Sequence, residues 1–413
     1  MAGLDPAIHV LVAARPKKRD MTVSARRVHR PRKDVDGRVK PGHDDNKNRE
    51  GTKIPMLVVR MLLFALALFA VPARAQDKPP AWDALVAAAE KDGALAIAGP
   101  SGRAWREELQ RFEKSYPAIK LSITALAGRD FWPRLLKERE AGQYLWDLRI
   151  GGADALSYRL LHMGVFAPSR PLLMLPDLLE DKTWLGGLDG IFLDNAHRFI
   201  IGFAVYETQA IYYNQRLLPD AAGLPLETLN EPRYAGKLSM ADPRGGASLN
   251  TLSVLDRAYG DGFVETLMVR QKPVITREPR QQIDWLASGR YPIAFGLPSI
   301  AFVEYAQRGG STADFAPARG ARAWSAGVGG IPFIEQAPHP AAAKLFVNWL
   351  LSRDVQATLM QAVKLNSRRT DVPLGAPETA LDPKALGDYV GTMDEAIQPY
   401  EERTVGILHR VLK

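Results

Sequence analysis

Apolar residues recur at two spacings along the chain, three or four residues in some segments and one or two in others. The first spacing is typical of amphipathic helices and the second of strands. Strands and helices alternate between Trp82 and Asp154, which favours a parallel sheet covered by helices. The pattern predicts helices over residues 82–91, 103–115 and 130–141, and strands over residues 95–98, 119–125 and 145–150.

Two of these strands end in turns of small residues, Gly99-Pro100-Ser101-Gly102 and Gly151-Gly152-Ala153-Asp154. Ligands of such sheets gather at the carboxyl ends of the strands, where a starting helix offers free backbone N–H groups. Neither turn has the spacing of a nucleotide-binding motif. An alternative for the first turn is a tight connection in which the serine only caps the helix. The candidate ligand-binding residues of these turns are Ser101, Gly102, Arg103, Gly152 and Ala153.

The segment 197–213 is long, apolar and rich in aromatic and β-branched residues, which predicts one continuous strand. Its Tyr206 is a candidate ligand-binding residue, although a tyrosine in a strand more often serves in packing.

A third turn of small residues, 242–248, joins a predicted strand over residues 238–241 to a predicted helix over residues 249–259. Arg244 and Ser248 of this turn are candidate ligand-binding residues, and the alternatives are a surface charge and a helix cap. A helix over residues 281–288 and a strand over residues 289–295 lead to one more such turn. There Ser299 is a candidate.

The segment 324–360 reads as a glycine-containing apolar strand, then a stop at His339-Pro340, then a helix with one apolar face. Its Ala337-Pro338-His339-Pro340, the helix over residues 341–352 and Gln356 resemble the return segment of type II periplasmic solute-binding proteins of ABC importers. Residues 226–237 also resemble this family, and the similarity extends from about residue 82 to residue 372.

This resemblance implies an α/β fold of two lobes, each a mixed sheet flanked by helices, joined by crossing strands. It places lobe 1 in residues 77–203 plus 328–372 and lobe 2 in residues 204–327, with closing helices over residues 373–413. In this family the first turn, residues 99–102, lines the cleft between the lobes. The turn over residues 242–248 comes from the other lobe, so it can face the first two turns across that cleft.

The resemblance is closest to the ferric-iron-binding branch, but that branch carries two adjacent tyrosines where this chain has Leu297-Pro298-Ser299. The four histidines after residue 75 do not form a ligand-spaced pair, and the chain has no cysteine. We therefore expect no metal site and no cofactor, and ferric-ion binding is kept only as an alternative.

Charge is unevenly distributed. The whole chain has a net charge of +8, but residues 1–75 hold 16 Lys/Arg and 7 Asp/Glu, which leaves 38 basic and 39 acidic residues in the rest. A nearly neutral body gives little support to nucleic-acid binding.

Residues 62–71 form a short apolar run followed by Ala73-Arg74-Ala75, which predicts a secretory signal peptide over residues 56–75 with cleavage between Ala75 and Gln76. The alternative, a membrane anchor, would need a longer run. Residues 1–55 are expected to be a disordered basic leader, or upstream sequence if translation starts at Met56 or Met61.

These patterns predict a monomeric periplasmic receptor that binds a small polar or anionic solute and delivers it to an inner-membrane ABC permease. The motifs of a nucleophile elbow, a serine–lysine pair and a zinc protease are absent from the sequence, so we expect no enzyme. A secreted hydrolase or transferase on a similar scaffold is the alternative, because a fold alone does not define activity.

Overall fold

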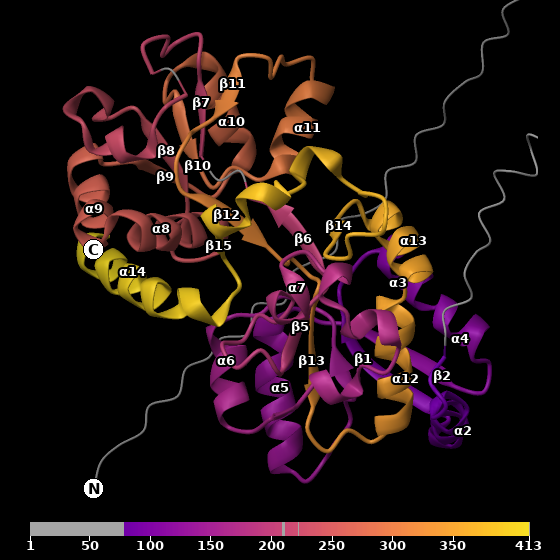
Figure 1. The fold of residues 1–413 in the computed structure, drawn as a ribbon. Helices are drawn as coiled ribbons and strands as arrows, with labels where there is room; N and C mark the ends of the chain where they lie inside the picture. Colours follow the sequence, from indigo (N-terminus) through magenta and orange to yellow (C-terminus); the bar gives the residue numbers. More distant parts are fainter. Residues whose placement is uncertain (1–77, 209–210, 222, 413) are drawn as a thin grey trace, which may run out of the picture. The chain divides into compact units, whose positions relative to one another are not determined.

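The computed structural model describes residues 78–208, 211–221 and 223–412 (Figure 1). The predicted leader and signal peptide lie outside these residues. We call the part built on the sheet ordered β2-β1-β3-β13-β4 the first lobe. Its strands are β1 (Ala94–Gly99), β2 (Lys120–Ala125), β3 (Leu148–Arg149), β4 (Phe166–Ala167), β5 (Ile200–Gly202) and β13 (Gly330–Ile334).

The first three strands of this lobe are parallel, as the alternating pattern predicted. Strand β13 returns late in the chain and runs antiparallel between β3 and β4, and it also pairs with β5, so the sheet is mixed. The helices of the lobe are α2 (Trp82–Asp92), α3 (Arg103–Leu109), α4 (Arg111–Ser115), α5 (Gly128–Glu140), α6 (Ala155–His162), α7 (Gly187–Gly190), α12 (Pro340–Leu351) and α13 (Arg353–Val363).

The segment that carries the family resemblance is held in place by two buried or half-buried acids of the first lobe. Asp147 is fully buried, and its carboxylate accepts hydrogen bonds from the backbone N–H groups of Ala96 and His339, both at 2.7 Å. The His339 ring lies 2.9 Å from the same carboxylate. Asp92 accepts from the first N–H groups of α12. The Ala-Pro-His-Pro stretch therefore forms the junction between β13 and α12, and hydrogen bonds to Asp147 and Asp92 hold this junction in place.

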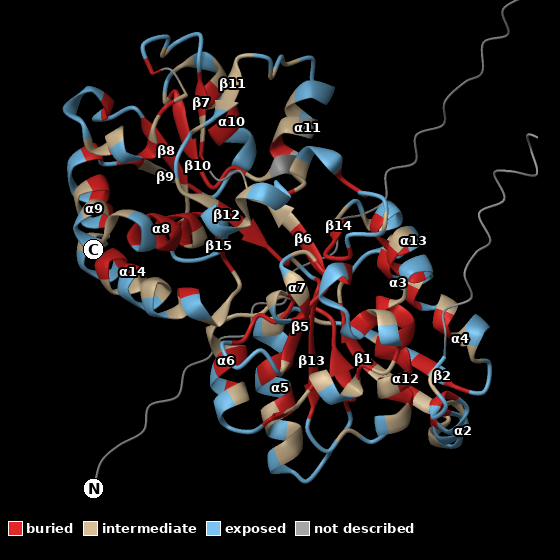
Figure 2. Cartoon of the chain, viewed as in Figure 1, coloured by how far each residue is buried: buried red, intermediate tan, exposed pale blue. Residues whose placement is uncertain are grey.

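The second lobe is built on the sheet ordered β11-β7-β10-β8-β9. Its strands are β7 (Ile211–Asn214), β8 (Leu238–Ala241), β9 (Val274–Thr276), β10 (Ile293–Phe295) and β11 (Phe315–Pro317). Its helices are α8 (Gly246–Tyr259), α9 (Asp261–Thr266), α10 (Pro279–Ser288) and α11 (Ser299–Gln307). The two lobes have separate hydrophobic cores, and buried residues concentrate on the strands of each (Figure 2).

A smaller sheet, which we call the connecting sheet, joins β14 (Asn366–Ser367), β6 (Ala204–Glu207), β12 (Arg322–Ser325) and β15 (Tyr389–Gly391) in that order. The last helix, α14 (Gln398–Val411), follows β15 and places Ile407 and Leu408 in the core of the second lobe. Residues 373–413 were expected to form closing helices over the lobes. They supply a strand of the connecting sheet and one α-helix, which packs on the second lobe.

The expected single strand over residues 197–213 is wrong. The structure divides it into β5, β6 and β7, and each pairs in a different sheet. The reason is topological: the chain crosses here from the first lobe through the connecting sheet to the second lobe. The apolar pattern of the sequence indicates that each piece is extended, but it does not indicate that the hydrogen-bond partners change from one piece to the next.

Two other expected elements are shorter than predicted. The strand over residues 145–150 is reduced to β3, because Leu145 is exposed and starts no pairing. The helix over residues 103–115 is divided at Gln110 into α3 and α4. Within the described residues no helix is long and apolar enough to cross a membrane.

Candidate functional site

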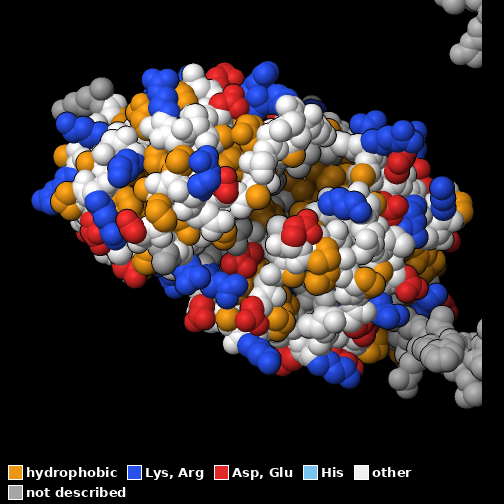
Figure 3. Space-filling view, turned by 90° about the horizontal axis from the view of Figure 1, so that it is seen from above, with side chains coloured by type: hydrophobic (Ala, Val, Ile, Leu, Met, Phe, Trp, Pro, Cys, Tyr) orange, Lys and Arg blue, Asp and Glu red, His pale blue; other side chains and the backbone are white. Residues whose placement is uncertain are grey.

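A cavity of about 1250 Å³ opens beside the connecting sheet and the second lobe. Seen from above, the described part of the chain is hollowed, with hydrophobic side chains inside the hollow and charged side chains at its edge (Figure 3). The walls come from β6, β7, the first turn of α8, the turn before α11 and the loop between β11 and β12. Thr379, Thr392 and Met393 of the C-terminal segment complete the lining.

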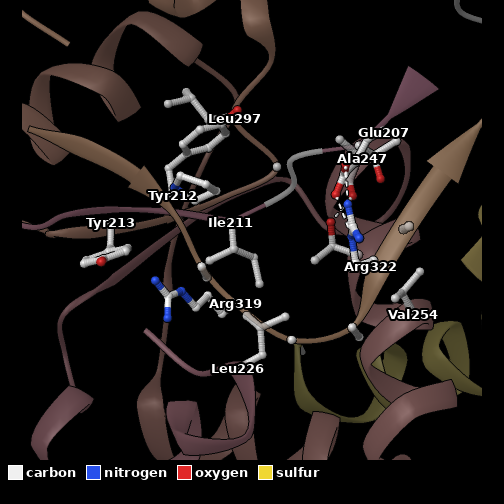
Figure 4. Close-up of a pocket in the computed structure, with 18 of the residues that line it drawn as sticks. Glu207, Ile211, Tyr212, Tyr213, Leu226, Ala247, Val254, Leu297, Arg319 and Arg322 are labelled. Atoms are coloured by element: carbon white, nitrogen blue, oxygen red, sulfur yellow. Dashed lines mark hydrogen bonds and ion pairs between the residues drawn. The ribbon is translucent and has the colours of Figure 1, made fainter. Parts of the chain in front are cut away.

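One wall of the cavity carries a bonded charge pair. Arg322 of β12 donates two hydrogen bonds to Glu207 of β6, at 3.1 and 3.0 Å (Figure 4). Tyr389 of β15 donates a third to the same carboxylate at 3.0 Å. The hydrogen bond from Arg322 to Glu207 raises the pKa of the guanidinium, which therefore stays charged. The three residues tie three strands of the connecting sheet together.

Two further arginines line the cavity from the second lobe. Arg216 pairs with Asp314 at 3.0 Å, so its charge is already balanced. The side chain of Arg319 is exposed and has no ion-pair or hydrogen-bond partner within the described residues. The lining holds three positive side chains, those of Arg216, Arg319 and Arg322. It holds two negative ones, those of Glu207 and Asp314, so there is one more positive than negative side chain. This balance favours an anionic or neutral solute over a cation.

The first turn of α8 forms another wall through Gly246 and Ala247. Ser248 follows them, and its hydroxyl is fully buried without a hydrogen-bond partner in the described chain. It lies against Gly296, where a Cβ would come within 2.2 Å of the Ser248 oxygen. Only glycine therefore fits at position 296, between this hydroxyl and the cavity. The first backbone N–H groups of α8 have no acceptor within the helix and lie beside this unpaired hydroxyl.

Three tyrosines also line the cavity, and two of them are adjacent. Burial raises the pKa of the Tyr212 hydroxyl to about 12, and its ring packs on Phe302 with centroids 4.5 Å apart. The Tyr213 oxygen accepts a hydrogen bond from the N–H of Gly223 at 3.0 Å. Because neighbouring side chains on a strand point to opposite faces, this pair does not form a two-phenolate site. The described residues also contain no group of three or more His, Cys, Asp or Glu suited to a metal ion.

Of the residues predicted from the sequence, Tyr206 lines this cavity. Ser101 is exposed, and Gly102 is the residue before α3, with a φ of 116° that glycine adopts readily. Arg103 and Arg244 are exposed at the surface in ion pairs with Glu107 and Asp242. Ser248 lies behind the wall, and the side chain of Ser299 is outside the part that the structure describes.

The remaining two predicted residues lie in the turn after β3. A Cβ on Gly152 would contact the Gly327 oxygen at 3.0 Å and the Met393 side chain at 3.1 Å, and Met393 lines the cavity. Ala153 is half-buried beside it and packs against the first lobe. This turn therefore reaches the edge of the cavity, whereas the turn after β1 has no contact that links it there.

The sequence analysis missed the charged residues of the cavity. Glu207 and Arg322 lie more than a hundred residues apart, at 207 and 322, so only the fold brings them together. A weaker signal was present in the predicted strand over residues 145–150, where two charged residues, Asp147 and Arg149, interrupt the apolar pattern. Charges are almost never fully buried without a specific partner, and such a residue is therefore informative.

The arrangement defines a class: a two-lobed α/β protein with a solute-sized cavity next to the strands that connect its lobes. Residues 96–357 match the model of the bacterial extracellular solute-binding proteins, and the chain belongs to that family. Members are the solute-binding components of ABC importers, so the chain binds a small solute in the periplasm and hands it to a permease.

Solved structures of periplasmic binding proteins share this fold at low sequence identity. The iron-bound HitA of Pseudomonas aeruginosa has a TM-score of 0.54 and 16% identity, with 77% of this chain and 99% of that chain covered. A Trichodesmium protein in complex with iron and citrate, IdiA or FutA, has a TM-score of 0.57 and 15% identity, with 77% and 99% covered. The Bordetella ferric binding protein has a TM-score of 0.57 and 16% identity, with 77% and 98% covered. No curated protein matches the chain.

Proposed function

We propose that the protein binds a small polar or anionic organic solute in the cavity described above, as a monomer that performs no reaction. The cavity carries the proposal, because its volume suits a small metabolite and its unpaired Arg319 supplies a positive charge. The free N–H groups at the start of α8 add the environment in which anionic oxygens are bound.

Ferric-ion binding, which the names of several similar structures suggest, has weaker support in this chain. Fe(III) prefers hard anionic ligands such as phenolates and carboxylates. Here burial opposes ionisation of Tyr212, and the Tyr213 oxygen is already engaged by a backbone N–H. Glu207, the carboxylate of the connecting sheet, is bonded to Arg322 and Tyr389.

Solute recovered from the purified protein tests the proposal. Protein isolated from the periplasm without refolding would be denatured, and the released small molecules identified by mass spectrometry. We expect one unmodified polar solute at close to one molecule per chain. Because Ala247 lies on the cavity wall in the first turn of α8, Ala247→Phe should abolish this recovery. Ala258→Phe, at an exposed position of the same helix, is the matched control and should retain it.

Several outcomes would contradict the proposal. Recovery of iron without any organic molecule would favour the ferric alternative. Conversion of the recovered compound during incubation with fresh protein would favour an enzyme. Equal recovery from Ala247→Phe and the wild type would place the solute elsewhere.

The location and processing of the chain are part of the same proposal. An exported receptor should reach the periplasm through the predicted signal peptide, with Gln76 as the first residue of the mature form.

A further inference from the structure

A second set of unused polar groups lies in the first lobe, at the ends of the strands β2 and β3. Trp132 of α5 is fully buried, and its indole N–H has no hydrogen-bond partner within the described residues. Arg149 of β3 is 5% exposed, and its Nε–H is likewise without a partner there. Buried donors are nearly always bonded, so two neighbouring exceptions point to a missing acceptor.

The Trp132 indole nitrogen and a different nitrogen of the Arg149 guanidinium, Nη2, lie close to one glycine. A Cβ placed on Gly128, the first residue of α5, would lie 3.2 Å from the Trp132 indole nitrogen and 3.3 Å from Nη2 of Arg149. It would also lie 3.0 Å from Oδ2 of Asp154. We call the space bounded by Gly128, Trp132, Arg149 and Asp154 the Gly128 recess. Gly128 and Asp154 are half-buried, so the recess borders solvent.

The donors of the recess are fixed in place. The Arg149 guanidinium lies 5.0 Å from the centre of the Trp132 ring, and its Nη1 donates to the Gly152 carbonyl at 2.9 Å. Helix α5 has thirteen residues, and the backbone N–H groups of Gly128 and Arg129 in its first turn donate to no acceptor in the described chain. A fixed cation, an indole donor and a helix start together form a site for an anionic oxygen.

Asp154 limits which anion fits. Its Oδ1 caps α6 by accepting from the N–H of Ser157, whereas Oδ2 faces the recess. The nearby negative charge of Asp154 also helps to raise the pKa of Glu401, after the larger effect of burial. A multiply charged phosphate would be repelled by these acids. A carboxylate whose neighbouring carbon carries an ammonium or hydroxyl group would satisfy both the donors and Oδ2 of Asp154.

The recess is connected to the cavity by the turn after β3. Arg149 is bonded to Gly152, and Gly152 faces Met393, which lines the cavity. We infer that the Gly128 recess is the first-lobe subsite for the α-substituted carboxylate end of the solute, as found in α-amino and α-hydroxy acids. This inference rests on the proposed function, because it assigns one end of the solute that the cavity holds.

Two substitutions test the inference with matched controls. Trp132→Phe keeps the ring and removes the indole donor. Trp82→Phe removes another buried indole N–H without a partner, on α2, and is its control. Gly128→Ala places a methyl group in the recess. Gly262→Ala, at the start of α9, meets no atom within 4 Å and is its control.

Titration calorimetry and thermal shift would use α-amino acids, α-hydroxycarboxylates, the same carboxylates without the substituent, and inorganic phosphate. We expect an α-substituted carboxylate to bind the wild type and to bind Trp132→Phe and Gly128→Ala about 10- to 100-fold more weakly, which corresponds to a hydrogen bond to a charged group. Both controls should bind as the wild type does. The unsubstituted carboxylate should bind more weakly than its parent.

The outcomes separate this inference from the function on which it rests. Unchanged affinity in both recess variants overturns the subsite and leaves the proposed function intact. Binding of inorganic phosphate, and of none of the carboxylates, overturns the carboxylate class, and the solute recovered from the periplasm then decides whether the proposed function stands. A wild type that binds none of these probes, and that carries no small molecule when isolated from the periplasm, overturns both.

Discussion

At the scale of single residues, Asp394 is a buried acid whose surroundings raise its pKa well above the ordinary value. It follows β15, and burial raises the pKa of its carboxyl to about 6, although the positive charges of Arg368, Arg257 and His197 oppose this shift. Its Oδ1 has no hydrogen-bond partner in the described chain. An acid held in this way is more easily protonated in the folded protein than in the unfolded chain.

The stability of the protein should reflect this difference. The unfolded aspartate ionises at about pH 3.9, whereas the folded one ionises at about 6. The stabilisation from the protonated acid is therefore complete below pH 3.9 and is lost as the pH rises to about 6. We expect Asp394→Asn to become more stable relative to the wild type over this range, by up to about 3 kcal/mol, and the difference to stay constant above it. Urea unfolding at a series of pH values measures it.

The exposed Asp388, in the same segment, provides the control. Asp388→Asn should follow the wild type at every pH. An equal difference between Asp394→Asn and the wild type at pH 4 and pH 7 would show that the carboxyl does not titrate as described.

At the scale of elements, α14 is attached by its apolar residues in the second-lobe core and also by an ion pair with a buried acid of α8. Asp256 of α8 is 1% exposed and accepts two hydrogen bonds from Arg403 of α14, at 2.8 and 2.9 Å. Removing the arginine would leave a buried carboxylate without its counter-ion, which is more costly than losing a surface pair.

We expect Arg403→Ala to lower the free energy of unfolding clearly more than Arg410→Ala does, because it leaves the buried Asp256 carboxylate without its counter-ion. Arg410, on the same helix, lies 3.8 Å from Glu265 in an exposed pair. Arg410→Ala should therefore change stability by less than about 0.5 kcal/mol. Equal losses in the two variants, measured by urea unfolding, would contradict a special role for Asp256.

Elements with a steady apolar period were predictable from the sequence. The helix predicted over residues 82–91 is α2, and the strand over residues 238–241 is β8, because each keeps one face in a single core. The segment 197–213 was not predictable in the same way, since its partners change twice while its composition stays apolar.

The candidate site was less predictable than the fold. Small-residue turns identified Gly152, which borders the cavity, but they also identified Arg103 and Arg244, which are exposed at the surface in ion pairs. The charged wall and the Gly128 recess depend on contacts between distant segments, and no local pattern encodes such contacts. Their only trace in the sequence is a charge where an apolar strand is expected.

At the scale of the whole molecule, the residues of the described cores all follow the predicted cleavage site, the first of them being Trp82. We therefore expect the form that starts at Gln76 to unfold at the same temperature as the longer chain and with the same cooperativity. N-terminal sequencing of the periplasmic protein and calorimetry check the two parts of this prediction. A protein that retains residues 56–75 and sediments with membranes would contradict the cleavage.

The position of β13 has a consequence for how the chain is made. Strands β3 and β4 are not paired with each other, because the place between them belongs to a strand that is synthesised more than 160 residues later. During synthesis the sheet of the first lobe lacks its β13 strand. This lobe cannot finish folding until nearly the whole polypeptide has been synthesised. Long-range pairing of this kind is slow. We therefore expect the newly made chain to stay loosely folded until β13 has been synthesised.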